Sequence, residues 1–91
     1  KVLETGVDLA LLLAVVSSFR DRCLPRDLVV FGEVGLSGEI RPVTSGQERI
    51  QEAAKHGFKR AIVPMANVPK KKIAGMEVTG VSKLIDALEL L

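Results

Sequence analysis

The chain has 91 residues, the length of a single domain, and 47% of them are hydrophobic, which is enough to build a core. It has no Trp or Tyr and three Phe, so this core must be largely aliphatic, and its formal charge of +2 permits an anionic partner without requiring one. The most apolar run, residues 9–16, is shorter than the roughly 20 residues of a membrane-spanning helix and lacks the flanks of a signal peptide. With a single cysteine, Cys23, which we interpret as a small apolar filler, these features predict a cytoplasmic protein without membrane contact.

The first predicted element is a helix from about Gly6 to Arg20. Thr5 and Asp8 have the spacing of a capping box at its start. Residues 9–16 are apolar on every side, which predicts a helix that is buried all round.

A hairpin is predicted next. Residues 28–36 are rich in Val and read as a strand, and residues 39–43 read as its partner. The Ser37-Gly38 pair between them is a turn signal.

A second helix is predicted from Ser45 to about His56, with Ser45 and Glu48 in capping-box spacing. Gly57 suits the left-handed position that ends a helix, and Phe58 can pack back as in a Schellman motif. His56 is expected to contact the last carbonyls of this helix rather than to act in catalysis.

The last part of the chain predicts a short buried strand at residues 60–64, a loop or a short, frayed helix broken by Pro69 at 65–75, and a strand at 76–81. Ser82 is expected to cap a closing helix, whose leucines at 84, 88 and 91 share one stripe. The order of elements predicts an α+β fold, a mixed sheet with a hairpin and right-handed βαβ crossovers.

Common catalytic signatures are mostly absent: the sequence has no GxxxxGK[ST] loop, HExxH or CxxC. Gly32, Gly35 and Gly38 belong to the predicted hairpin, whereas a nucleotide-binding glycine loop follows a strand and opens a helix.

Residues 31–43 have the sequence FGEVGLSGEIRPV. This segment resembles the T-G-E-(x)-T-L-x-G-x-V-x-P segment of Lon-type protease domains. The Ala/Leu-rich helix before it and the run AAKHGFKRAIVPMAN at residues 53–67 match as well, so the resemblance covers almost the whole chain. Within this superfamily, DLA at residues 8–10, VSSFR at 16–20 and FGEVGLSGE at 31–39 are most similar to a bacterial branch of DNA-repair and recombination ATPases.

The resemblance implies a Lon-protease-like fold (ribosomal protein S5 domain 2-like) over residues 1–91. It also implies that the chain is an excised C-terminal domain that lacks the first strands of that fold. The parent protein of that branch has an N-terminal zinc ribbon and a RecA-like ATPase. ATP, Mg and Zn are therefore expected only in those missing parts, with no cofactor or metal in this domain.

Lon-type peptidases use a serine before the first helix and a lysine on the second. The resemblance places these positions at Gly6 and Arg49. Glycine offers no nucleophile, and arginine keeps its proton and cannot serve as the base. We therefore expect no catalytic residues, and we interpret Thr5 as a cap rather than a displaced nucleophile.

The same resemblance implies DNA as a partner, through phosphate contacts that are not sequence-specific, and self-association into rings. Recombination proteins are further candidate partners. Phosphate contacts need only a basic patch. The DNA-binding candidates are Arg20, Arg22, Arg26, Arg41, Arg49, Lys55, Lys59 and Arg60, and a further basic run is Lys70, Lys71 and Lys72.

Three functions stay open on the sequence. The first is a non-catalytic assembly and DNA-binding module of a recombination or repair ATPase. The second is an active Lon-type Ser–Lys peptidase, against which Gly6 and Arg49 argue directly. The third is a domain that binds another protein without touching DNA, in which each basic cluster is simply a solvated face.

Overall fold

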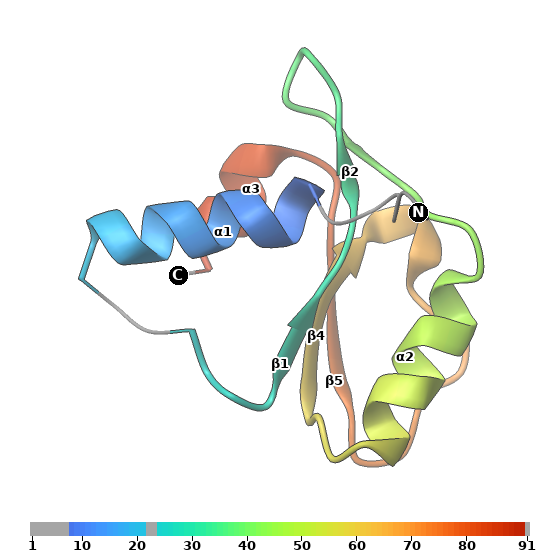
Figure 1. Cartoon of the computed structure of the whole chain (residues 1–91). Helices are drawn as coiled ribbons and strands as arrows, with labels where there is room; N and C mark the ends of the chain where they lie inside the picture. The colour runs from blue at the N-terminus through green and yellow to red at the C-terminus, as the bar shows by residue number, and fades with distance from the viewer. Residues whose placement is uncertain (1–7, 22–23, 91) are drawn as a thin grey trace, which may run out of the picture.

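The computed structural model describes residues 8–21 and 24–90. Three α-helices, a short 3₁₀ helix and five strands follow one another in this part of the chain (Figure 1). In order they are α1 (Asp8–Phe19), β1 (Leu28–Val30), β2 (Glu33–Val34), β3 (Ile40–Arg41), α2 (Gly46–Lys55), β4 (Arg60–Pro64), η1 (Met65–Asn67), β5 (Glu77–Val81) and α3 (Leu84–Leu88).

Strands β1, β4 and β5 form a parallel sheet in that order, with β4 in the centre. Strands β2 and β3 form an antiparallel hairpin. A bridge between Glu39 and Lys83 joins this hairpin to the end of β5, where the N–H of Ile40 donates to the carbonyl of Ser82 over 2.9 Å. The predicted α+β class, with parallel and antiparallel pairing, is confirmed, as is the buried strand at residues 60–64.

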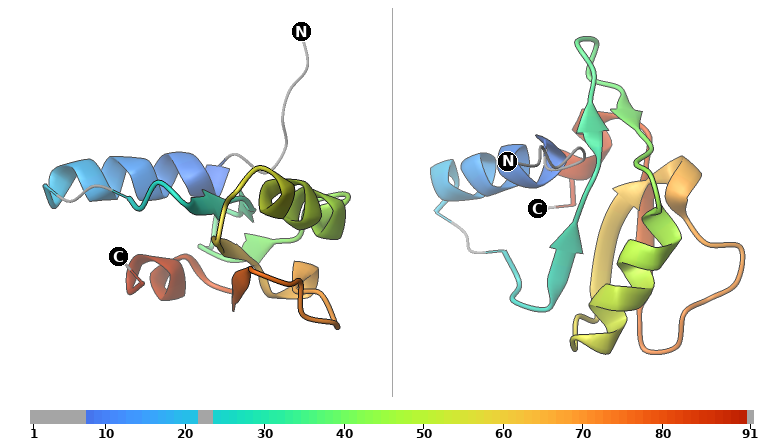
Figure 2. Two further views of the ribbon diagram at one scale, coloured as in Figure 1. Left: turned by 90° about the horizontal axis from the view of Figure 1, so that it is seen from below. Right: turned by 45° about the vertical axis from the view of Figure 1, so that its right-hand side comes forward.

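Helices cover both faces of the parallel sheet. Figures 1 and 2 show α1 and α3 on one face and α2 with η1 on the other. Side chains of a strand alternate between faces, so Ile62 on β4 packs with Leu13 of α1, whereas Val63 packs with Ile50 of α2. The result is two aliphatic cores separated by one sheet.

The prediction of one continuous strand at residues 28–36 is wrong. The strand is interrupted at Phe31 and Gly32, between β1 and β2. The carbonyl of Gly32 accepts the N–H of Leu9 over 3.1 Å and so holds the chain against the start of α1. Gly32 has φ +153°, and an added Cβ would lie 3.2 Å from the Leu9 side chain. The backbone turns here to receive the helix.

The second helix starts directly after Ser45 as predicted, but neither of the predicted serine caps forms. Ser45 lies before α2 in the left-handed region (φ 58°, ψ 36°), and its side chain makes no capping bond, because this conformation does not direct the hydroxyl to the free N–H groups. Lys83, not Ser82, immediately precedes α3. Thr5, Gly6 and the side chain of Asp8 lie outside the described residues, as does Leu91.

The end of α2 is as predicted. Gly57 has φ +90°, and its N–H donates to Ala54 while that of Phe58 donates to Ala53, which together form a Schellman motif. The ring Nδ1 of His56 lies 3.0 Å from the carbonyl oxygen of Glu52, in agreement with the expected contact to the last turn.

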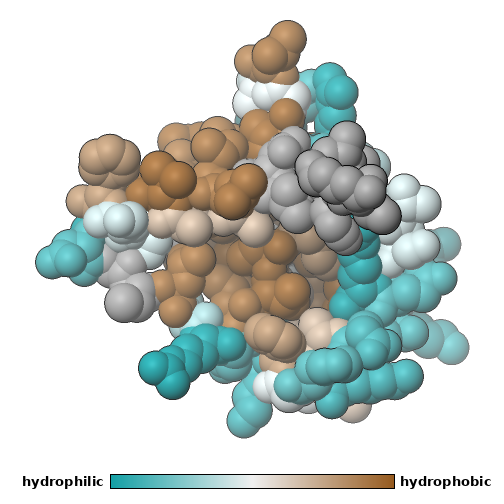
Figure 3. All heavy atoms as spheres, in the orientation of Figure 1, coloured by the Kyte–Doolittle hydropathy of each residue, from teal (hydrophilic) through white to brown (hydrophobic). Residues whose placement is uncertain are grey.

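Helix α1 is not buried all round as its sequence predicts. Leu9, Leu13 and Ser17 face the sheet and are buried. The opposite side carries exposed apolar residues, and Figure 3 shows hydrophobic atoms gathered over this helix. These exposed residues, which we call the α1 stripe, are Leu11, Leu12, Val15 and Phe19. Among the described residues, no helix is long and apolar enough to span a membrane.

Candidate nucleic-acid interface

Four of the predicted DNA-binding residues meet at one end of the sheet. The N–H groups of Lys59 and Arg60 both donate to the carbonyl of Asp27, over 2.9 and 3.1 Å, which brings Arg26 beside them. Lys55 closes α2 only four residues before Lys59, across the Schellman turn. We call Arg26, Lys55, Lys59 and Arg60 the basic end; all four are exposed.

The basic end is partly neutralised. Arg60 Nε lies 3.6 Å from Asp27 Oδ1, and Arg60 also stands opposite Glu77 in the strand register. Within the described part of the chain, no ion pair is present for Arg26, Lys55 or Lys59. Three cations therefore face solvent together, although they come from two separate segments of sequence.

The lysine run after η1 lies near the same end. Lys71 and Lys72 line a shallow hollow that also includes Glu77, the first residue of β5. The N–H of Glu77 donates to the carbonyl of Lys59 over 2.8 Å, which ties this region to the basic end. The run itself was visible in the sequence, but its position beside Lys59 depends on the pairing of β4 with β5.

Arg20 and Arg26, two members of the predicted cluster of Arg20, Arg22 and Arg26, have different neighbours. Arg20 directly follows α1, and its Nη1 lies 3.4 Å from the carbonyl oxygen of Leu88 in α3, on the face of the sheet that α1 and α3 cover. Arg26 belongs to the basic end instead. Arg22 lies outside the described residues.

Arg41 is engaged within its own hairpin. Its Nη2 and Nε donate to Glu39 Oε2 over 2.8 and 3.1 Å. A backbone hydrogen bond at Glu39 itself and the bond from Arg41 hold the pKa of the Glu39 carboxyl below its ordinary value. Arg41 thus braces the hairpin.

The second predicted dyad position, Arg49, lies half-buried on α2 with its guanidinium carbon 5.8 Å from the centre of the Phe31 ring. This is the distance of a cation–π contact. The nucleophile position, Gly6, lies outside the described residues. Among the residues that are described, no group of three or more His, Cys, Asp or Glu is arranged to hold a metal.

Comparison with known proteins defines the class. A family model described as "Subunit ChlI of Mg-chelatase" matches residues 4–67, more than half of the chain, and the chain therefore belongs to this family. The description differs from that of the Lon-type family to which the motif at residues 31–43 was compared.

Individual relatives are DNA repair proteins. RadA of Escherichia coli K12 is 76% identical over 90 residues, which are 99% of this chain and 20% of that protein. RadA of Aquifex aeolicus is 48% identical over 90 residues, and RadA of Bacillus subtilis 168 is 47% identical over 90. The chain spans about a fifth of the length of these relatives. Their name agrees with the DNA-repair branch indicated by the sequence.

Proposed function

We propose that this chain is a non-catalytic assembly and DNA-binding module of a RadA-type DNA-repair ATPase, with a Lon-like fold, from the C-terminal part of that protein. RadA relatives support the repair role because they match nearly the whole chain, whereas the ChlI match ends at residue 67. The Lon-like assignment rests on the motif at residues 31–43 and on the α+β fold.

The observation that carries the DNA proposal is the basic end. Lysine and arginine neutralise phosphates without reading bases, and they do so best when several are grouped. Arg26, Lys55 and Lys59 are exposed; the backbone bond from Lys59 to Asp27 brings Lys59 beside Arg26, and Lys55 ends α2 four residues before Lys59. Since the sequence has no Trp or Tyr for base stacking, binding through phosphates is the mode that these residues favour.

The module has no peptidase role in this proposal. Gly6 and Arg49 occupy the positions of the serine and lysine in Lon-type peptidases, and neither can perform the chemistry. ATP, Mg and Zn are assigned to other parts of the parent protein. In this proposal the module supplies a basic surface that contacts DNA and a surface through which copies associate, and it acts in the cytoplasm.

Fluorescence anisotropy with a labelled duplex tests the DNA role. Charge removal in the triple variant Arg26→Gln, Lys55→Gln, Lys59→Gln should weaken binding equally on unrelated sequences. The slope of log affinity against log salt should flatten by about 0.9 for each phosphate that the variant no longer neutralises. Because these side chains are exposed, the fold should be unaffected.

A matched pair sharpens the result. Lys59→Gln removes one charge from the basic end, whereas Lys83→Gln removes one charge from an exposed lysine beside the hairpin. Only the first should flatten the salt slope. If both variants bind like the wild type, and the triple variant does too, the DNA role is wrong and a module that binds protein alone takes its place.

A further inference from the structure

The hairpin tip presents an apolar residue on a rigid support. Leu36 is fully exposed, with a relative accessibility of 107%. The N–H of Gly35 donates to the carbonyl of Glu39 over 2.9 Å, and that of Gly38 donates to Gly35 over 3.0 Å. The Glu39 carboxylate also accepts the N–H of Ser37 over 3.2 Å. The turn is therefore fixed before any partner arrives, which lowers the entropic cost of binding.

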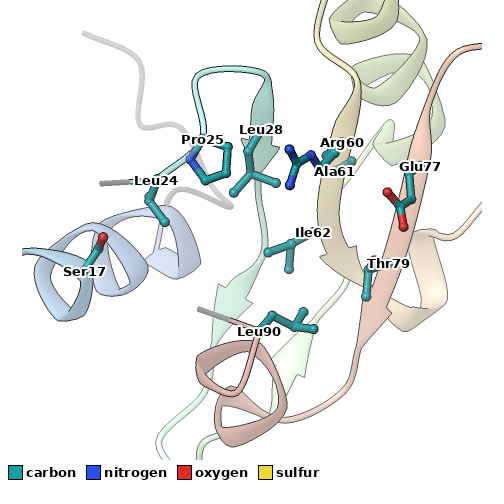
Figure 4. A pocket seen from close by; sticks show the side chains of 10 residues that line it. All are labelled: Ser17, Leu24, Pro25, Leu28, Arg60, Ala61, Ile62, Glu77, Thr79 and Leu90. Atoms are coloured by element: carbon teal, nitrogen blue, oxygen red, sulfur yellow. The ribbon is translucent and has the colours of Figure 1, made fainter. Parts of the chain in front are cut away.

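A hollow of about 380 Å³ lies elsewhere on the same chain, between the end of α1, the start of the sheet and the end of α3. Figure 4 shows its apolar walls and, from neighbouring strands, the side chains of Arg60 and Glu77. The walls are Leu24, Pro25, Leu28, Ile62 and Leu90. Its volume falls within the ~300–1,000 Å³ of pockets that enclose a bound group.

We propose that Leu36 of one copy inserts into this hollow of a second copy. The apolar side chain matches the apolar walls, and the charges complement each other. Glu39 and Arg41 stand at the base of the inserted turn, and Arg60 and Glu77 stand at the hollow, so each carboxylate can meet a guanidinium of the other copy.

The proposed contact joins two different surfaces, the turn of one copy and the hollow of a second copy. In Figure 1 the turn after β2 projects at the opposite end of the structure from the start of β1, where the hollow lies, so the turn does not fill the hollow of its own chain. An interface of this kind is heterologous, and it leaves a free turn and a free hollow on every dimer. This proposal deepens the self-association in the proposed function and rests on it.

Sedimentation velocity of the 91-residue chain over a range of concentrations tests the contact. Leu36→Ser removes the inserted side chain, and Leu90→Glu places a charge in the wall of the hollow. Both residues are exposed, so the fold is retained, which circular dichroism verifies. Each variant alone should associate at least about tenfold more weakly, as when an interface anchor is truncated. Met65→Ser, an exposed apolar residue away from both surfaces, is the matched control and should associate like the wild type.

Mixing the two variants gives the decisive result. The Leu36→Ser chain keeps an intact hollow and the Leu90→Glu chain keeps an intact turn, so the mixture should form dimers of one copy of each and stop there. A wild type that stays monomeric, or a mixture that stays monomeric, overturns the proposal. So does association that survives both variants but is abolished when Leu11 and Val15 of the α1 stripe are changed to Ser. Anisotropy with a short duplex keeps the two proposals separate, since Leu36→Ser lies away from the basic end and should bind that duplex like the wild type. Leu90→Glu is left out of this comparison, because it places a carboxylate in the hollow that Arg60 also lines.

Discussion

At the scale of single residues, the hairpin depends on one carboxylate. Glu39 accepts hydrogen bonds from Arg41 and from the N–H of Ser37, all within five residues of sequence. The backbone bond at Glu39 and the Arg41 bond favour the ionised form and lower its pKa from the ordinary value of 4.5. A group whose pKa is lower in the folded state stabilises that state above its unfolded pKa and ceases to do so as the pH falls through its folded pKa.

Glu39→Gln should therefore lower the midpoint of urea unfolding at pH 7. The difference from the wild type should close as the pH falls from 4.5 through the lower folded-state value. Glu89→Gln is the control, because Glu89 is exposed and has no ion pair among the residues that the structure describes. A difference between Glu39→Gln and the wild type that persisted unchanged at low pH would show that the carboxylate does not brace the turn.

At the scale of elements, one side chain connects η1 to the segment that leads into α2. Asn67 accepts the N–H of Val43 over 2.8 Å and donates to the carbonyl of Val43 over 3.1 Å. It also lies against Gly46, the first residue of α2, where an added Cβ would fall on the Asn67 side chain. The amide thus replaces the strand partner that Val43 lacks and fixes the start of the helix.

Asn67→Ala should destabilise the fold by about 1–3 kcal/mol, because it leaves the polar backbone groups of Val43 without a partner. Gly46→Ala should also destabilise it, since the new methyl group meets the amide. In the double variant that methyl group has room, so the combined destabilisation should be smaller than the sum of the two single effects. Additive effects in thermal or urea unfolding would contradict the packing of Asn67 against Gly46.

How far the sequence predicts these elements depends on the range of the interactions that fix them. The Schellman ending at Gly57 and the strand at residues 60–64 follow from local pattern and are confirmed. Ser45 has the spacing of a cap, yet its backbone is left-handed and its hydroxyl makes no capping bond, while the contacts of Asn67 with Val43 and Gly46 on either side come from a distant part of the sequence. The sequence predicts the members of the basic end one by one, but their grouping depends on Asp27 bonding to residues 32 and 33 positions later, which no local pattern reports.

At the scale of the whole molecule, the sheet separates two cores that share no side chain among the described residues. Ile62 belongs to the core under α1 and α3, and Ile50 to the core under α2. Both are buried, with accessibilities of 6% and 0%. Both cores use the backbone of the same strands, but the side chains on the two faces pack separately.

Ile62→Val and Ile50→Val should each lower the free energy of unfolding by about 0.5–1.5 kcal/mol. Together they should lower it by the sum of the two values to within about 0.5 kcal/mol, because no side chain packs with both. Ile50→Val combined with Val63→Ala, in the same core, is the comparison and should depart from additivity. Strong coupling between Ile62 and Ile50 in urea unfolding would mean that the two cores act as one.

The central position of β4 also determines when the sheet can form during synthesis on the ribosome. Its partner β1 ends at Val30, but the pairing residues Arg60 to Ile62 are made much later, and β5 follows at Glu77. A nascent chain that ends before Arg60 therefore carries α1 and β1 with no sheet to receive them. Loops of this length close slowly compared with local contacts. The apolar side chains of α1 therefore stay without their sheet until β4 has been made, and aggregation during this interval would lower the yield of the folded protein.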